Sequence, residues 1–295
     1  MSKRWLILDC NNMCWRSFHT TGNLSHEGSA TGVLFGFFRD VRALQENHNT
    51  KRVVFAFDVG RSLRSIVYPE YKTKRREKRE QQTDAEKMAY IALNNQIKSL
   101  RKDYLPFIGY KNIFSAKGYE ADDVIASVCR NSLGESDEAI IVSTDQDLYQ
   151  LLSSRVSIWN PHRNVLLDKS WFRKTYGIKV SQWKEVKALA GCNTDDVKGI
   201  KGVGEKTAVK FIKGELAPTT KAFQNIEKQN AEIRLRNLPL VSLPYEGTPV
   251  FKLEDDKVDS DRWQELAQKL GMKSLRDPRK LIKINKPKMA GLLDE

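Results

Sequence analysis

Short apolar runs alternate with longer helical patterns over about residues 1–180, and this alternation predicts the fold class. Because strand–helix–strand alternation covers both faces of a sheet with helices, we expect an α/β fold with a central, mostly parallel sheet and flanking helices. The apolar positions from Gly32 to Leu44 fit a buried helix between the first two strands. The predicted strands span residues 4–9, 53–58, 112–115, 139–143 and 155–159.

The pattern changes after the second predicted strand and again after residue 180. Residues 61–80 are basic and lack core-forming periodicity, and beyond residue 180 the chain becomes mainly helical. We therefore expect an α/β core over 1–180, a helical region over 181–282 and a frayed tail over 283–295. A helix is also predicted from about Thr83 to Lys102, with an apolar side made of Met88, Ile91, Ala92, Ile97 and Leu100.

Composition narrows the class of partner. The formal net charge is +13 and 40% of the residues are hydrophobic, which fits a globular protein with a polyanionic partner. No apolar run approaches the roughly 18 residues of a membrane span, so no membrane association is expected. The four cysteines form no C-x-x-C pair and the four histidines are scattered, which argues against a zinc site or a disulfide framework and favours reduced thiols in a cytoplasm.

Acidic residues follow several of the predicted strands. Asp9, Asp58 and Asp145 each end or follow an apolar run, and Asp147 lies two positions further on. Each has an ordinary alternative as a strand-end acid or a helix N-cap. However, the carboxyl ends of parallel strands share one edge of a sheet, where gathered carboxylates repel one another unless a hard cation lies among them. The pattern therefore implies Mg²⁺ or Mn²⁺.

Three more acids open a helical pattern at residues 119–128. Glu120 and Asp123 are three positions apart and share a helix face, whereas Asp122 is displaced around the axis. The alternative is that acids near a helix N-terminus offset the helix dipole. Dipole compensation explains one or two carboxylates more easily than three.

A glycine-rich turn precedes the helical pattern that begins near residue 205. Gly202 and Gly204 permit a tight turn with outward-facing amides, which binds phosphate without reading bases, and Lys201 and Lys206 add charge. The Walker spacing is absent. The turn resembles a helix-hairpin-helix, a sequence-independent duplex-binding element; the alternative is an ordinary link between helices.

The basic segment directly follows the strand that ends at Asp58. A charge run is usually a solvated, disordered loop. Here its position predicts that it lies over the edge of the sheet where the acidic residues gather. We then expect Lys72 and Arg75 to contact the scissile phosphate and Tyr71 to stack on a base.

Taken in order, these motifs resemble the 5′-nuclease or flap endonuclease family, especially the stand-alone bacteriophage enzymes and the 5′-nuclease domain of bacterial repair polymerases. The resemblance covers about residues 4–245. The matching motifs are Leu8-Asp9 with Asn12 and Arg16, Phe57-Asp58, Pro69-Glu70-Tyr71-Lys72 with Arg75, Glu120-Ala121-Asp122-Asp123, Ser143-Thr144-Asp145-x-Asp147, and Leu189-Ala190-Gly191 through Gly199-x-x-Gly202-x-Gly204.

The resemblance implies a nuclease core with a helical arch at about residues 62–105 and a helix-hairpin-helix at about 191–213 that grips duplex DNA and holds K⁺. Arg16 and Arg64 would contact phosphates of the cleaved strand, and Lys72 and Arg75 would be catalytic cations of the arch. The first of two metal ions would be held by Asp9, Asp58, Glu120, Asp122 and Asp123, and the second by Asp145, Asp147 and Asp195.

One position departs from the family. An aspartate usually follows the glycine that corresponds to Gly191, but this chain has Cys192, and sulfur is a poor ligand for Mg²⁺. We expect a Mg²⁺-dependent 5′-3′ exonuclease or flap endonuclease that removes primers or flaps in replication. The alternative is a structure-specific DNA-binding protein with weakened catalysis.

The implied partners are branched or 5′-single-stranded DNA and RNA–DNA hybrids, with replication proteins as further candidates. We expect a monomer in the cytoplasm, which would be the host's if the chain is phage-encoded.

Overall fold

The central sheet carries the acidic residues at one of its edges. The computed structural model describes residues 3–277 and 288–289, and its seven-stranded sheet has the order β11-β8-β7-β6-β1-β4-β5. β1 (Arg4–Asp9) pairs in parallel with β4 (Arg52–Ala56) on one side and with β6 (Glu138–Val142) on the other. The remaining strands are β5 (Ile113–Phe114), β7 (Val156–Asn160), β8 (Val165–Leu167) and β11 (Lys288–Met289).

The predicted mostly parallel sheet is confirmed, and each of the five predicted strands overlaps an observed one. β8 was not predicted, because three apolar residues after a turn give too short a pattern. It is antiparallel to β7. The predicted tail over 283–295 lies outside the described residues except for Lys288–Met289, which pair in parallel with β8.

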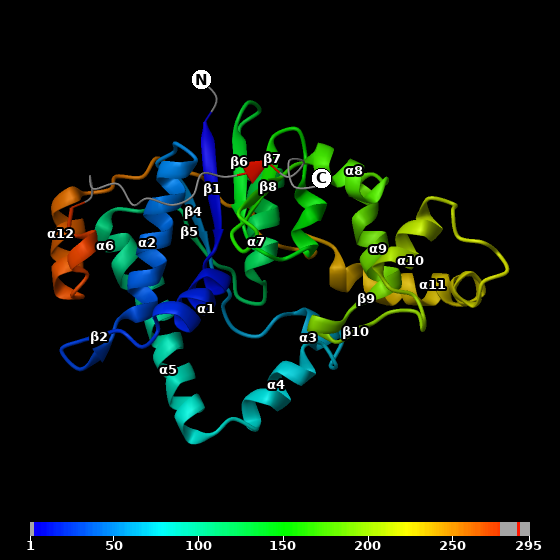
Figure 1. Cartoon of the computed structure of the whole chain (residues 1–295), viewed down its shortest axis with the longest axis horizontal. Helices are drawn as coiled ribbons and strands as arrows, with labels where there is room; N and C mark the ends of the chain where they lie inside the picture. The colour runs from blue at the N-terminus through cyan, green and yellow to red at the C-terminus, as the bar shows by residue number, and fades with distance from the viewer. Residues whose placement is uncertain (1–2, 278–287, 290–295) are drawn as a thin grey trace.

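Helices cover both faces of the sheet because alternate strand residues enter different cores (Figure 1). Trp5 and Ile7 lie in one core, whereas Leu6 and Leu8 lie in the other. The first core also contains residues of α7 (Ala121–Ser127), α8 (Lys169–Tyr176), α9 (Trp183–Ala190), α10 (Glu205–Ile212) and α11 (Lys221–Val241). The second contains residues of α1 (Cys10–Thr21), α2 (Gly32–Asn47), α5 (Asp84–Ser99), α6 (Leu105–Ile108) and α12 (Ser260–Lys269).

The basic segment forms an arch-like projection. α3 (Arg64–Val67) leads to α4 (Thr73–Glu80), and Figure 1 shows α4 and α5 projecting from the core on the side where β1 ends. α5 begins with a capping box between Thr83 and Glu86. Its predicted apolar side is wrong at Met88 and Ile91, which are 66% and 51% exposed, because the first half of α5 projects away from the core.

Two small antiparallel ribbons lie outside the central sheet. β2 (Ser25–His26) pairs with β3 (Ser29–Ala30), and β9 (Gly191–Cys192) pairs with β10 (Val197–Lys198). The second ribbon lies between α9 and α10, at the predicted helix-hairpin-helix. In the part of the chain that the structure describes, no helix is long and apolar enough to cross a membrane.

A buried ion pair ties the base of the arch to the core. Arg64 is 2% exposed and Asp123 is fully buried, and their two nitrogen–oxygen distances are 2.6 and 2.7 Å. Arg64 also donates to the carbonyl of Leu240, and Asp123 accepts from the backbone N–H of Tyr245. The pair therefore joins α3 and α7 to the last turn of α11 and to the segment that follows it.

Replacing Arg64 with methionine leaves Asp123 charged and unpaired in the core. We expect this change to lower the free energy of unfolding by about 3–5 kcal/mol, measured by urea denaturation. The control is Arg4→Met, which removes an exposed pair with Glu138 and should cost about 0–1 kcal/mol. Equal losses in the two variants would contradict the importance of the buried pair.

Candidate active site

Strand register gathers the acidic residues at the carboxyl edge of the sheet. Asp9 pairs with Ala56 at the end of β4, so Asp58 lies two residues beyond that level, just after the neighbouring strand. Leu8 pairs with Val142 in β6, which places Ser143 beside the end of β1. The Ser143 hydroxyl lies 3.4 Å from an Asp9 oxygen and accepts a hydrogen bond from the backbone N–H of Asp145.

The start of α7 adds further carboxylates to this edge. The backbone N–H of Ala121 donates to Asp58 across 2.7 Å, which fixes the first turn of the helix beside β4. Glu120 is the N-cap of α7, and Asp122 lies in its first turn. Asp9, Asp58, Asp122 and Asp145 are called the first acidic cluster below.

Burial and mutual repulsion raise pKa values in the first acidic cluster. The pKa of Asp9 is raised to about 7, chiefly by burial and then by the charge of Asp58. Burial, followed by repulsion from Asp145, Asp9 and Asp58, raises the pKa of Asp122 well above its usual value. Desolvation also raises the pKa of Asp58. These carboxylates are therefore close enough to destabilise one another's charged forms.

A second group combines two carboxylates with sulfur. The ligand atoms of Asp147, Cys192 and Asp195, called the second cluster below, lie within 4.8 Å of one another. Asp147 and Cys192 line a cavity of about 500 Å³ together with Asp145, so the two clusters adjoin. Burial, followed by the charge of Asp145, raises the pKa of Asp147 to about 6.

Lys187 belongs to this site and was missed in the sequence. Its ammonium lies 3.0 Å from Asp147 and 2.9 Å from Glu205, and the side chain is buried. Burial opposes the charge, but the two acids outweigh it and raise the pKa of Lys187. The sequence did indicate that this lysine is buried. Lys187 follows Trp183 by four positions and so lies on the apolar face of α9.

The arch supplies cations to the acidic edge. Lys72 pairs with Glu120 and lies 3.8 Å from Asp195, and Arg75 lies 3.0 Å from Asp195. Burial disfavours the Glu120 carboxylate, yet Lys72 and Arg64 outweigh that effect and lower its pKa. Lys72 has a φ of 56°, a left-handed conformation that costs a non-glycine residue on the order of 1–3 kcal/mol, and its backbone N–H is held by the carbonyl of Asp195.

Three predicted roles are contradicted by side-chain placement. Both oxygens of Asp123 are bonded to Arg64, so Asp123 does not face the acidic cavity as a metal ligand. Arg64 is buried in that pair and cannot reach a DNA phosphate. Tyr71 is 3% exposed, and its hydroxyl donates to Glu120 and approaches Asp195, so the ring is not available to stack on a base.

The remaining predicted DNA-contacting residues lie at or near the surface. Arg16 lines a cavity of about 440 Å³ that shares Asn12, Thr144 and Gln146 with the acidic cavity. Gly202 has a φ of 81°, a conformation that suits glycine, and a Cβ there would meet nothing within 4 Å. Lys201, Gly202, Gly204 and Lys206 are all exposed around the start of α10.

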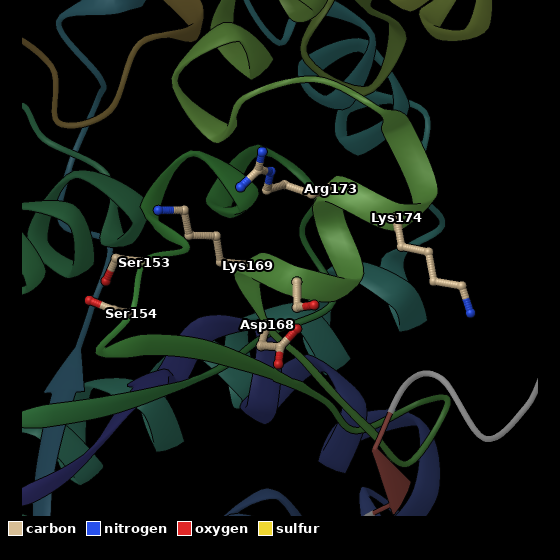
Figure 2. Close-up of a pocket in the computed structure, with 7 residues that line it drawn as sticks. Ser153, Ser154, Asp168, Lys169, Arg173 and Lys174 are labelled. Carbon is tan, nitrogen blue, oxygen red and sulfur yellow. The ribbon is translucent and has the colours of Figure 1, made fainter.

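A separate cavity of about 720 Å³ lies at the amino ends of β6 and β7, the opposite edge of the sheet from the acids (Figure 2). Figure 2 shows Lys169 and Arg173 on α8 near this cavity, while Lys174 points away from Ser153 and Ser154. Its one acid, Asp168, caps α8 by accepting from the backbone N–H of Trp171. The carboxylates needed for metal chemistry are therefore at the other edge.

Comparisons with solved structures agree with this arrangement at the level of the fold. The chain is similar to the T5 5′-exonuclease with bound divalent metal ions (zinc), with a TM-score of 0.70 and 22% identity over 94% of this chain and 98% of that one. It is also similar to the catalytic core of Rad2 in complex with DNA substrate, with a TM-score of 0.55 and 15% identity over 92% and 88% of the two chains.

Curated relatives fall into two groups by length. The chain is 29% identical to a 5′-3′ exonuclease of Aquifex aeolicus over 92% of this chain and 94% of that protein. It is 31% identical to the thermostable DNA polymerase I of Thermus aquaticus, covering 78% of this chain but only 26% of the polymerase. The family model for the 5′-3′ exonuclease N-terminal resolvase-like domain matches residues 4–177, and the chain therefore belongs to the 5′-3′ exonuclease family.

Proposed function

We propose that this chain is a metal-dependent, structure-specific 5′-nuclease that cleaves DNA, or the RNA strand of an RNA–DNA hybrid, where a 5′ single strand meets a duplex. The observation that carries the proposal is the first acidic cluster at the carboxyl edge of the sheet, beside cations of the arch. Family membership supports a nuclease, and the metal and DNA in the names of the structural relatives support this class of ligands.

The donor set fits hard divalent cations. The first acidic cluster offers oxygen ligands, which suit Mg²⁺ and Mn²⁺. Its pKa values are raised by burial and then by mutual repulsion, which a cation would relieve. We propose two divalent cations: Mg²⁺ or Mn²⁺ near Asp9, Asp58, Glu120 and Asp122, and a second ion near Asp145, Asp147 and Asp195. Mg²⁺ keeps several waters, so some of these carboxylates would act through water. When bound, the ions would activate water and stabilise the attacking and leaving oxygens of the phosphodiester.

The chain's own cations would position the phosphate. The Arg75 side chain is half-exposed and bonded to Asp195, so it can exchange a carboxylate oxygen for a phosphate oxygen. Lys72 is held more firmly, between Glu120 and Asp195. We propose that both bind the scissile phosphate as its negative charge grows. Lys187 would hold Asp147 in place from the other side.

The duplex would be bound at the start of α10 through phosphate contacts. The exposed amides of Gly202 and Gly204, with Lys201 and Lys206, suit backbone phosphates without base readout. A K⁺ ion bound by carbonyls of this turn would add to that contact. Arg16, in the neighbouring cavity, would bind a phosphate of the cleaved strand. The role that follows is removal of primers or flaps in replication, by a monomer that works beside other replication proteins.

Changing one ligand to its amide separates catalysis from DNA binding. Asp145→Asn keeps an oxygen that can accept from the backbone N–H of Asp147, so the local turn should survive. We expect cleavage of a labelled 5′-flap in Mg²⁺ to fall by more than about a hundredfold, while flap binding in EDTA stays unchanged.

Asp168→Asn is the matched control, because asparagine caps a helix as well as aspartate and Asp168 lies at the opposite edge of the sheet. Full activity in D145N would contradict the proposed site. Flap binding by the wild-type protein with no metal-dependent product would instead favour the catalytically weakened DNA-binding alternative.

Protons and metal ions should compete for the acidic residues. In the metal-free folded protein the pKa values of Asp9 and Asp147 are raised from 3.8 to about 7 and about 6. Groups with a raised folded pKa stabilise fully below the unfolded pKa, and this contribution is lost as pH rises through the folded value. We therefore expect the free energy of unfolding in EDTA to fall from about pH 4 to about pH 7, and Mg²⁺ to reverse much of that fall.

Asp9→Asn provides the control for this pH effect, because its amide does not titrate. The fall in EDTA should be smaller in D9N than in the wild-type protein when both are measured by urea denaturation. An equal fall in both proteins, or no effect of Mg²⁺ on the wild-type curve, would contradict the assignment of Asp9 to a cation-binding cluster.

A further inference from the structure

Cys192 holds the position at which the family usually has an aspartate, and its sulfur lies near two carboxylates and 3.0 Å from the Thr194 hydroxyl. The sulfur belongs to the second cluster, whose ligand atoms lie within 4.8 Å of one another, and it lines the cavity that contains Asp145. β9 holds Cys192 through its pairing with Val197 in β10. Backbone at Gly191 packs closely on Gly199, since a Cβ on Gly191 would meet the Gly199 nitrogen at 2.4 Å. The β9–β10 ribbon and the close packing at Gly191 therefore place the sulfur.

The charges around the second cluster are already largely balanced. Lys187 lies 3.0 Å from Asp147, and Arg75 lies 3.0 Å from Asp195. Lys72 lies 3.8 Å from Asp195 as well. A divalent cation that binds here therefore gains less electrostatic free energy than one that binds at the first acidic cluster, where the carboxylates repel one another strongly. The chemical type of the ligand atoms becomes more important for which cation binds.

We propose that Asp147, Cys192 and Asp195 form a subsite that binds a thiophilic divalent cation, such as Zn²⁺ or Co²⁺, in preference to Mg²⁺. Sulfur ligands favour such ions, whereas Mg²⁺ favours oxygen alone. On binding, a sulfur–metal bond replaces the S–H bond of Cys192 and the proton passes to solvent, with no transfer of electrons. The inference rests on the proposed function only for the role of the bound ion, since binding itself requires no substrate.

Cobalt absorption provides a direct test, because a bond from thiolate sulfur to Co²⁺ gives a charge-transfer band in the near ultraviolet. Co²⁺ is titrated into the reduced, metal-free full chain. We expect the band in the wild-type protein, its loss in Cys192→Ser and its retention in Cys129→Ala, whose thiol is buried in the hydrophobic core and does not line the cavity. Absence of the band in the wild-type protein, or its persistence in C192S, would overturn the proposal.

A second variant keeps the test valid if C192S folds poorly. Cys192→Asp replaces the sulfur with the oxygen ligand that is usual in the family. The ratio of Co²⁺ to Mg²⁺ affinity, measured by competition calorimetry, should fall by about tenfold relative to the wild-type protein. An unchanged ratio would show that the sulfur takes no part in metal binding and would refute the proposal.

Cleavage of a labelled 5′-flap, run in parallel with Mg²⁺ and with Co²⁺, separates this inference from the proposed function. A cobalt–thiolate band without cleavage under either ion would support the subsite and reject the nuclease. Cleavage without the band would support the nuclease and reject the subsite.

Discussion

Repulsion among carboxylates at the carboxyl edge of the sheet is the constraint on which the rest of the structure depends. The pKa of Asp9 rises to about 7 and that of Asp122 rises well above its usual value because burial and neighbouring acids disfavour their charges. A fold that places these groups together must supply positive charge from elsewhere. Lys187 from α9 pairs with Asp147, and Lys72 and Arg75 from the arch pair with Glu120 and Asp195, which adjoin the first acidic cluster. We propose that a divalent cation supplies the positive charge to the first acidic cluster itself. The basic composition of the chain thus serves the acidic site as well as any polyanionic partner.

The arch is joined to the core by contacts that are themselves electrostatic. Arg64 and Asp123 form the buried pair at its base, and Glu120 holds both the Lys72 ammonium and the Tyr71 hydroxyl. Residues that lie next to each other in the sequence motif therefore have different tasks. Asp122 belongs to the first acidic cluster, Asp123 holds the base of the arch through Arg64, and Glu120 pairs with Lys72.

Much of the fold and part of the site could be predicted from the sequence. The strands are visible as apolar runs, and parallel pairing then places Asp9, Asp58 and Asp145 on one edge. The sequence could not show which way each acidic side chain at the start of α7 points. Asp123 was therefore predicted to bind a metal ion, although it is paired with Arg64. Tyr71 was misassigned for the same reason, because its burial depends on a partner far along the chain at Asp195. Met88 and Ile91 have helical spacing, but spacing does not reveal that their part of α5 leaves the core.

The central claim, that the gathered carboxylates hold divalent cations, is tested most directly by anomalous diffraction from crystals soaked in Mn²⁺. The account predicts a Mn²⁺ peak among Asp9, Asp58, Asp122 and Asp145, with Asp123 still bonded to Arg64. Anomalous maps with no peak at this edge of the sheet, although the carboxylates are ordered and close together, would contradict it.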